Sequence, residues 1–302
     1  MRSKAMGHMP TLRKMWKYRA LYLILLPSIA YFIIFHYIPY LGLSIAFKDF
    51  SPARGIWGSP WVGFEYFREL MGMSQFKQVF KNTVIISCYK LLFGFPVPIV
   101  FALLLNEVKN MAFKKSIQTI TYFPHFLSWI VFGGIVLTFL TPNGVLPKLL
   151  AMIGVDASNL LTSSGTFRGI LVVSDVLKEF GWGAIICLAA LAGIDPHLYE
   201  AARMDGASRW RQTLHITIPG IRSTIILLFI LQLGKLLDVG FEQIFVLYNP
   251  TVYGVADIID TYVYRIGLGN AEYSLATAAG MFKGVIGFVL IVSANQIIKK
   301  LG

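Results

Sequence analysis

The chain is poor in charge, since only 14% of its 302 residues are Asp, Glu, Lys or Arg. Soluble domains carry about 25% charged residues. Here 56% of the residues are hydrophobic and the mean hydropathy is +0.65. Such a composition is typical of an integral membrane protein and argues against a soluble enzyme or a soluble binding domain.

Cysteine is also scarce, and the motifs of several function classes are missing. The two cysteines, Cys88 and Cys187, lie in apolar runs, so we expect no disulfide framework, and no CxxC or Cys/His cluster predicts a metal site. A G-x-x-x-x-G-K-[ST] phosphate loop is absent, so this chain is not an ATPase of that type. HExxH and GxSxG patterns are absent too. We therefore expect no catalytic residue, no metal and no cofactor on this chain.

Long apolar runs are what the sequence has instead. Each is about 20 residues or more, enough to cross a hydrocarbon core of about 30 Å as a helix. The runs cover residues 21–47, 82–106, 117–140, 169–192, 223–248 and 272–298. The first is too long for the apolar part of a cleaved signal peptide, so we expect it to remain as a span. The predicted fold is an all-α membrane protein with a basic leader at residues 1–20 and six transmembrane helices within residues 21–302.

The net charge of +12 is explained by topology. Six spans place both termini on one side of the membrane, and about twice as many Lys and Arg residues fall on that side as on the other. By the positive-inside rule both termini are cytoplasmic, and so is the polar segment 195–221 between the fourth and fifth spans. The basic excess therefore predicts orientation and no nucleic-acid partner.

The polar segment 195–221 holds too many charged residues to cross a bilayer core. Asp195 is a suitable N-cap for a helix that has Pro196 at its first position. That helix is expected to break near Gly206, because glycine tolerates left-handed backbone angles. A second short helix is expected to begin around Ser208 and to stop before Pro219. We predict a helix–glycine–helix element that lies outside the membrane.

The spacing in this element resembles the EAA loop of bacterial importers driven by ATP-binding cassette (ABC) subunits. Glu-Ala-Ala at 200–202 is followed by three residues and then Gly206. Nine further residues lead to Ile216, and after one more residue come the apolar Ile218 and Pro219. Ile218 stands where the family more often has Leu. The residues that the resemblance assigns to coupling with the ATPase are Glu200, Ala201, Ala202, Asp205, Gly206, Ile216 and Pro219.

The resemblance extends over the whole chain and is carried by residues 122–129, 240–250 and 260–265. These phrases resemble permease subunits of carbohydrate ABC importers, especially the LplB-like oligosaccharide permeases, which are related to MalF-type sugar permeases and have the MetI/MalF-like fold. The resemblance implies a multi-pass subunit of the bacterial cytoplasmic membrane that translocates a sugar or oligosaccharide. It also implies three kinds of partner: a second permease of similar fold, two cytoplasmic ABC subunits that bind ATP and Mg, and an extracytoplasmic solute-binding protein.

Two other function classes stay open. An ion-gradient-driven secondary transporter or channel commonly shows internal repeats with matching broken helices, and no clear repeat is present. A membrane-embedded enzyme requires a catalytic cluster, and no known motif supplies one. Co-purification with an ATP-binding subunit discriminates the importer from both.

Charged residues within the fourth and fifth spans are candidates for a substrate path. A charge at a bilayer centre costs at least about 2.5–3.5 kcal/mol, so these groups should face protein or water. The candidates for contact with a sugar are Asp175, Glu179, Trp182, Asp238, Glu242 and Gln243. In the alternative interpretation the charges only neutralise each other, Lys178 with Asp175 and Lys235 with Asp238.

The predicted outer loops, residues 48–81 and 249–271, carry aromatic residues and carboxylates. We expect these loops to contact a binding protein or to line the entry, with Asp257 and Asp260 among the exposed acids. Alternatively, the loops only pack over the ends of the spans.

Overall fold

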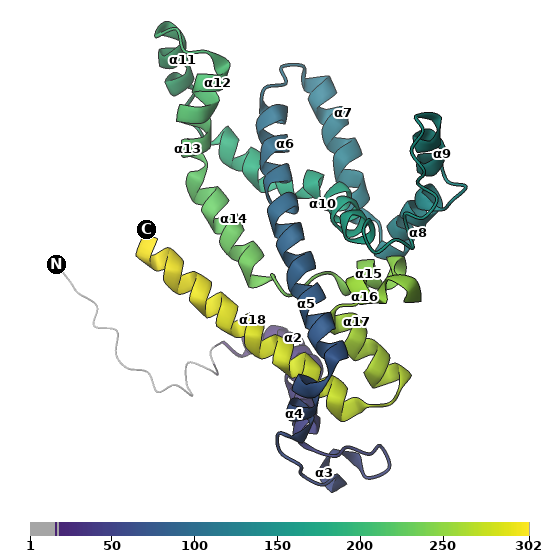
Figure 1. The fold of residues 1–302 in the computed structure, drawn as a ribbon. Coiled ribbons are helices and arrows are strands. Elements are labelled where there is room, and N and C mark those ends of the chain that lie inside the picture. Colours follow the sequence, from purple (N-terminus) through teal and green to yellow (C-terminus); the bar gives the residue numbers. More distant parts are fainter. Residues whose placement is uncertain (1–15, 17, 302) are drawn as a thin grey trace, which may run out of the picture.

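The computed structural model describes residue 16 and residues 18–301, so most of the predicted leader at residues 1–20 lies outside the described residues. The regular secondary structure of the described residues is helical, apart from one isolated antiparallel bridge between Lys48 and Trp61. Figure 1 shows the long helices running between an end that carries α11 and α12 and an end that carries α3 and α4. The predicted all-α class is confirmed.

The first half of the described chain contains short and long helices, several of which follow one another directly. In order these are α2 (Arg19–Phe32), η1 (Ile33–Tyr37), η2 (Ile38–Phe47), α3 (Gly55–Gly58), α4 (Glu65–Gly72), α5 (Ser74–Tyr89), η3 (Lys90–Gly94), α6 (Pro96–Asn106), α7 (Met111–Tyr122), η4 (Phe123–Phe126), α8 (Trp129–Leu140) and α9 (Val145–Met152).

The second half begins with one long helix and ends with another. In order the elements are α10 (Phe167–Ala192), α11 (Pro196–Met204), α12 (Arg209–Gln212), η5 (Thr213–Thr217), α13 (Ile218–Gly220), α14 (Arg222–Gly234), α15 (Phe241–Leu247), η6 (Pro250–Val252), α16 (Tyr253–Ala256), α17 (Ile259–Tyr264), η7 (Arg265–Gly269) and α18 (Tyr273–Leu301).

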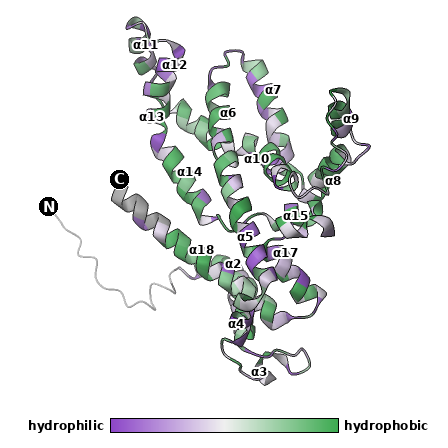
Figure 2. Cartoon of the chain, in the orientation of Figure 1, coloured by the Kyte–Doolittle hydropathy of each residue, from purple (hydrophilic) through white to green (hydrophobic). Residues whose placement is uncertain are grey.

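The described chain has four helices that are long and apolar enough to cross a membrane, and two bent helix pairs raise the number to six. The four are Arg19–Phe47, Ser74–Asn106, Trp129–Met152 and Tyr273–Ser293. The pairs are Phe167–Ala192 with Pro196–Met204, bent by 70°, and Arg209–Gly220 with Arg222–Gly234, bent by 60°. Figure 2 shows apolar residues along these helices and polar residues gathered near α11 and α12. If each bent pair is one span, the number agrees with the six predicted spans, although several bounds differ.

Two predicted spans are wrong as continuous helices. Residues 117–140 are interrupted because α7 ends at Tyr122, η4 follows with Pro124 in its first turn, and Leu127 is extended. Residues 223–248 are interrupted between Lys235 and Gly240, where Gly240 has φ +90°. Hydropathy cannot detect such breaks, because it averages over the residues that make them.

The predicted helix stop before Pro219 is also wrong. A π turn occupies Thr213–Thr217, and α13 begins directly after it at Ile218. Pro219 therefore stands within a continuous helical run, Arg209–Gly220, directly after the π turn. The chain bends two residues after Pro219, at Ile221, between α13 and α14.

Three clusters of buried apolar residues lie one above another along the molecule. The first joins α4, α5, α17 and α18 around Phe76 and Tyr262. The second joins α5, α10, α15 and α16 around Phe167 and Ile244. The third joins α6, the end of α10 and the start of α14 around Ile221. Because α10 contributes to the second and third clusters, it is the element that connects them.

Candidate functional site

The element at residues 195–221 folds largely as its sequence predicts. Asp195 accepts a hydrogen bond from the backbone N–H of His197 at 3.0 Å and so caps α11. Gly206 follows α11 with φ +72°, a conformation that favours glycine. Ser208 caps α12 through the N–H of Arg211 at 3.4 Å. α11 is tied to η5, which follows α12, by the hydroxyls of Tyr199 and Thr217, which lie 3.0 Å apart.

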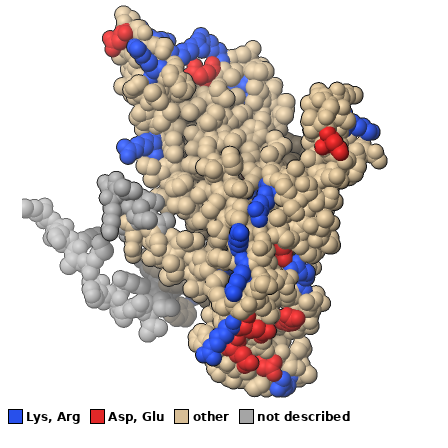
Figure 3. Space-filling view, viewed as in Figure 1, with Lys and Arg blue, Asp and Glu red and all other residues tan. Residues whose placement is uncertain are grey.

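This element projects from the rest of the chain and is exposed (Figure 1). The coupling candidates Glu200, Ala201, Asp205, Gly206 and Pro219 are all exposed, while Ala202 and Ile216 are half-buried. Figure 3 shows basic and acidic side chains gathered at this end of the molecule.

Sequence reasoning missed two large apolar side chains on the same element. Met204 is 88% exposed and Trp210 is 73% exposed. Exposed apolar side chains of this size on a polar projection are candidates for contact with a partner protein. The signal was present in the sequence, since both lie within a segment otherwise rich in charge.

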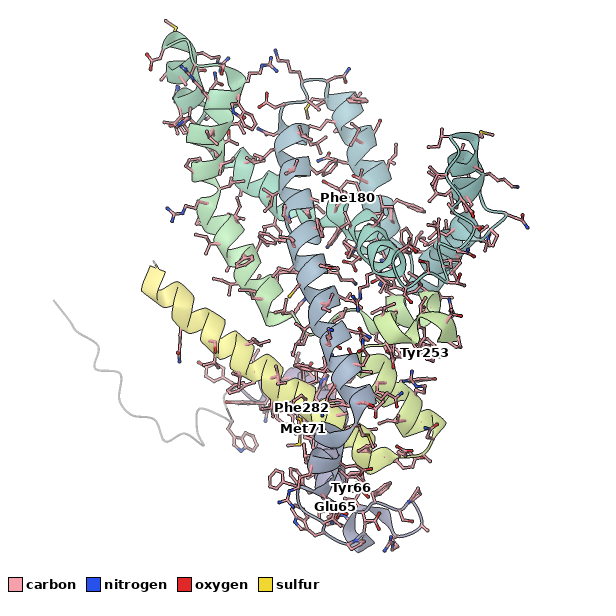
Figure 4. All side chains as sticks on the ribbon, in the orientation of Figure 1. Glu65, Tyr66, Met71, Phe180, Tyr253 and Phe282 are labelled. Carbon is pink, nitrogen blue, oxygen red and sulfur yellow. The ribbon has the colours of Figure 1, made fainter. Side chains whose placement is uncertain are left out.

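The second candidate site is an open cavity of about 600 Å³, lined by residues of α5, η3, α6, η4, α8, α10, α14 and the segment after α14. A volume of this size falls in the usual range for a small-molecule site. Its wall combines aromatic rings with charged and amide side chains. The polar and aromatic residues of the lining are Ser87, Lys90, Phe95, His125, Trp129, Asp175, Glu179, Phe180, Trp182, Gln232, Lys235 and Asp238. Phe180 is labelled on α10 in Figure 4.

A histidine and a tryptophan form an ordered pair in this cavity. The ring of His125 stacks on that of Trp182 with 4.5 Å between centroids and 3° between planes. His125 Nδ1 lies 2.7 Å from Glu179 Oε2, which fixes the orientation of the imidazole. Lys178 donates to the carbonyl of His125 at 2.9 Å and to Glu179 at 3.3 Å. The loop around η4 is therefore bound firmly to α10.

The predicted charge pairs are wrong. Asp175 pairs with Lys90 at 2.8 Å and not with Lys178, because Lys90 reaches it from η3. Lys235 and Asp238 lie in the break after α14, and within the described residues neither forms an ion pair. Both are exposed to the cavity instead.

The structure brings four of the six predicted path residues together. Asp175, Glu179, Trp182 and Asp238 line the cavity. Glu242 is exposed on α15 outside the lining, and Gln243 is fully buried behind it. Lys235, Asp238 and Glu242 share no helical face, because no helix runs through the break. Sequence reasoning missed His125 and Trp129 as lining residues, although the phrase Phe-Pro-His-Phe marked the place.

The two outer acids singled out from the sequence are not exposed docking groups. Asp257 is buried and pairs with Arg265 at 2.5 Å, beside Tyr253 (Figure 4). Asp260 receives two hydrogen bonds from Lys283, at 2.6 and 2.7 Å. Each carboxylate binds a cation of its own chain, so these two groups hold the loop structure together.

Comparison with known proteins gives consistent matches. The pattern of the family described as binding-protein-dependent transport system inner membrane component matches residues 94–302. Protein LplB of Bacillus subtilis (strain 168) is 47% identical over 281 residues, which cover 93% of this chain and 88% of that protein. The polygalacturonan/rhamnogalacturonan transport system permease protein YteP of the same organism is 44% identical over 290 residues, covering 96% of this chain and 90% of that protein.

The fold matches one solved transporter over nearly its full length. A chain of a bacterial ABC transporter involved in the import of the acidic polysaccharide alginate superposes with a TM-score of 0.89 and 43% identity, covering 97% of this chain and 99% of that chain. The alginate transporter was also solved in complex with an alginate pentasaccharide-bound periplasmic protein, and that chain gives a TM-score of 0.88 at 42% identity. These matches confirm the resemblance drawn from the sequence.

Proposed function

Because this chain belongs to the family of inner-membrane components of binding-protein-dependent transport systems, we propose that its cavity carries an oligosaccharide across the membrane. The chain is a multi-pass permease subunit of the cytoplasmic membrane in a sugar ABC importer. The observation that carries the proposal is the cavity of about 600 Å³ lined by aromatic rings and hydrogen-bonding groups.

The chemistry of the cavity suits a sugar. Carboxylates accept hydrogen bonds from hydroxyls, and amides both accept hydrogen bonds from hydroxyls and donate to them. Aromatic rings pack against the C–H faces of a pyranose. Glu179 and Asp238 supply carboxylates there, and Trp129 and Trp182 supply rings. Since His125 covers one face of Trp182, a sugar would pack on the remaining faces of this pair.

The energy is proposed to come from a separate ATPase that binds ATP and Mg. The exposed element at 195–221 supplies the contact, with Glu200 and the neighbouring alanines against the ATPase and Gly206 at the bend. The further partners are a second permease of similar fold and a solute-binding protein. A binding protein is supported by the alginate transporter, which was solved with one.

An acidic oligosaccharide is the substrate class we propose. Two relatives above 40% identity support it, since one is named for polygalacturonan and rhamnogalacturonan and the other imports the acidic polysaccharide alginate. In the cavity Lys235 has no carboxylate partner among the described residues and can meet a carboxylate of a glycan.

The test is purification of the tagged chain from its native membrane. We expect a second permease and an ATP-binding subunit to co-purify, and ATP hydrolysis in proteoliposomes to rise with binding protein and glycan. Acidic oligosaccharides and their methyl esters form a matched pair of substrates. Preferential uptake of the free acids supports the substrate class, whereas equal uptake overturns it.

The competing function, ion-gradient-driven transport, is tested in the same vesicles. Uptake by this chain alone that follows an ion gradient and needs no ATP would contradict the importer.

A further inference from the structure

The fifth span is broken within the membrane region. α14 ends at Gly234 and α15 begins at Phe241, and the six residues between them, Lys235–Gly240, form no helix. Non-helical backbone at membrane depth is tolerated only where protein or a water-filled cavity satisfies its polar groups. Here the carbonyl of Val239 accepts a hydrogen bond from Lys90 at 2.7 Å.

Lys90 makes three such bonds, each to a different group. Its ammonium donates to Asp175 on α10 at 2.8 Å, to the Val239 carbonyl, and to the side-chain oxygen of Gln243 on α15. A lysine has three N–H donors, so all are used. Lys90 lines the cavity but has no donor left for a sugar, and its side chain is only 10% exposed.

Gln243 completes the joint from the other side. Its amide donates to the carbonyl of Leu171 at 2.7 Å and to the hydroxyl of Ser174 at 2.8 Å, both on α10. Together, Lys90 and Gln243 fasten α15 to η3 and α10. Gly240 is part of the same arrangement, because a Cβ added there would lie 3.4 Å from the ammonium of Lys90.

The two sides of the break are packed differently. Three of the seven residues of α15 are buried, whereas α14, all of which the structure describes, has no buried residue. Two cavities, of about 600 and 360 Å³, flank the break, and both are lined by Leu236 and Asp238. The break therefore has space on both sides.

We propose that Lys90 is a positioning residue that holds α15 in place, so that α14 swings about residues 235–240 when the 195–221 element moves. The proposal rests on the importer function. α14 is joined to that element through Ile221, which is fully buried against α6 and the end of α10. A displacement of the 195–221 element therefore moves α14. Because α15 is held in place, the backbone between the two helices has to take up that movement.

The first experiment uses Lys90→Met in the complete importer, reconstituted with its binding protein. We expect glycan imported per ATP hydrolysed to fall roughly tenfold, while the binding-protein concentration for half-maximal uptake stays within about twofold. Lys148→Met is the control, since Lys148 is exposed on α9 and lies outside the cavity lining and outside the joint. Its uptake per ATP should stay within about twofold of the parent. The proposal is overturned if Lys90→Met imports as much glycan per ATP as the parent but needs a higher binding-protein concentration for half-maximal uptake. Lys90 would then be a ligand for the substrate.

Lys90→Met also leaves the carboxylate of Asp175 without its partner. A second experiment therefore leaves Lys90, Asp175 and Gln243 unchanged. In a Cys88→Ser, Cys187→Ser background, Gly133→Cys with Val246→Cys bridges α8 and α15, where an ideal Cβ at residue 133 lies 3.4 Å from that of residue 246. Gly234→Cys with Ile291→Cys bridges α14 and α18, where the Cβ at residue 234 lies 3.9 Å from Ile291 Cγ1. We expect the second bridge to abolish uptake until it is reduced, and the first to leave uptake unchanged.

Uptake that persists with the α14–α18 bridge formed, or that stops with the α8–α15 bridge, overturns the hinge. The parent complex is measured alongside the variants. Failure of the parent to import glycan counts against the proposed function, whereas the differences between variants test the hinge alone.

Discussion

At the scale of single residues, charges within the membrane region are stabilised by partners on other helices. Lys90 reaches Asp175 from another element, and Lys283 reaches Asp260 across 23 positions of sequence. Removing one partner of a buried pair leaves the other charge uncompensated, which costs more than the pair contributes. Tertiary packing decides which partners this far apart in sequence meet. Pairing each charge with a neighbour in the sequence therefore predicted the wrong ion pairs.

Trp182 gives the prediction at this scale. Trp182→Ala removes the ring that stacks with His125, and aromatic contacts of this kind are worth about 0.5–1.5 kcal/mol. We expect the glycan concentration for half-maximal uptake to rise about tenfold, measured with radiolabelled oligosaccharide at saturating binding protein.

Two variants control this measurement. Trp182→Phe keeps a ring and should retain most of the affinity. Glu242→Gln, on α15 but outside the cavity lining, should have a smaller effect than Trp182→Ala. If Trp182→Ala takes up a panel of glycans as the parent does, then Trp182 is structural and the sugar path lies elsewhere.

At the scale of elements, the sequence was sufficient for the number of spans and for the coupling element, and insufficient for the breaks. Apolar run length predicts six crossings, and local capping residues such as Asp195 and Ser208 predict the helices of the exposed element. The break at 235–240 depends on Lys90, which lies far away in the sequence. The cavity follows from the breaks, so its full lining could not be derived from helical periodicity.

Gly206 gives the prediction for the coupling element. Its φ of +72° is costly for a β-branched side chain, and an added Cβ would meet no atom within 4 Å, so any penalty comes from the backbone. We expect Gly206→Val to reduce glycan uptake more than about tenfold while ATP hydrolysis by the assembled complex persists.

Gly206→Asn is the matched variant, because asparagine tolerates the left-handed region and adds a side chain of similar size. Uptake by this variant should stay close to that of the parent. If Gly206→Val shows normal substrate-stimulated uptake, the bend at Gly206 is not needed for coupling and the prediction is contradicted.

At the scale of the whole molecule, the cavity lies where the helices are interrupted. The π turn η3 separates α5 from α6, η4 separates α7 from α8, and the break separates α14 from α15. The cavity is lined by residues of all three interruptions, whereas α10 passes it as one helix of 26 residues. The second and third apolar clusters are therefore connected by one unbroken helix, α10, while the other helices that line the cavity are interrupted beside it.

The end of the molecule that carries α3 and α4 is the surface proposed to receive the binding protein. Glu65 and Glu69 are exposed one turn apart on α4, and Trp57 is 85% exposed nearby in sequence on α3. Figure 3 shows acidic side chains gathered at this end, and Figure 4 labels Glu65 there. Since Asp257 and Asp260 are bound within the chain, these exposed acids are the better candidates for contact with a partner.

Reversing both charges tests this surface. Because an exposed ion pair contributes up to about 1 kcal/mol, Glu65→Lys with Glu69→Lys should raise the binding-protein concentration for half-maximal uptake by about fivefold or more. Asp156→Lys is the control, since Asp156 is equally exposed in the loop after α9 and lies away from α4. The difference between the two variants should shrink as ionic strength rises, because salt screens exposed charges. Equal binding-protein requirements in both variants and the parent would assign α4 to packing over the spans, and the docking surface would then have to be formed by other loops.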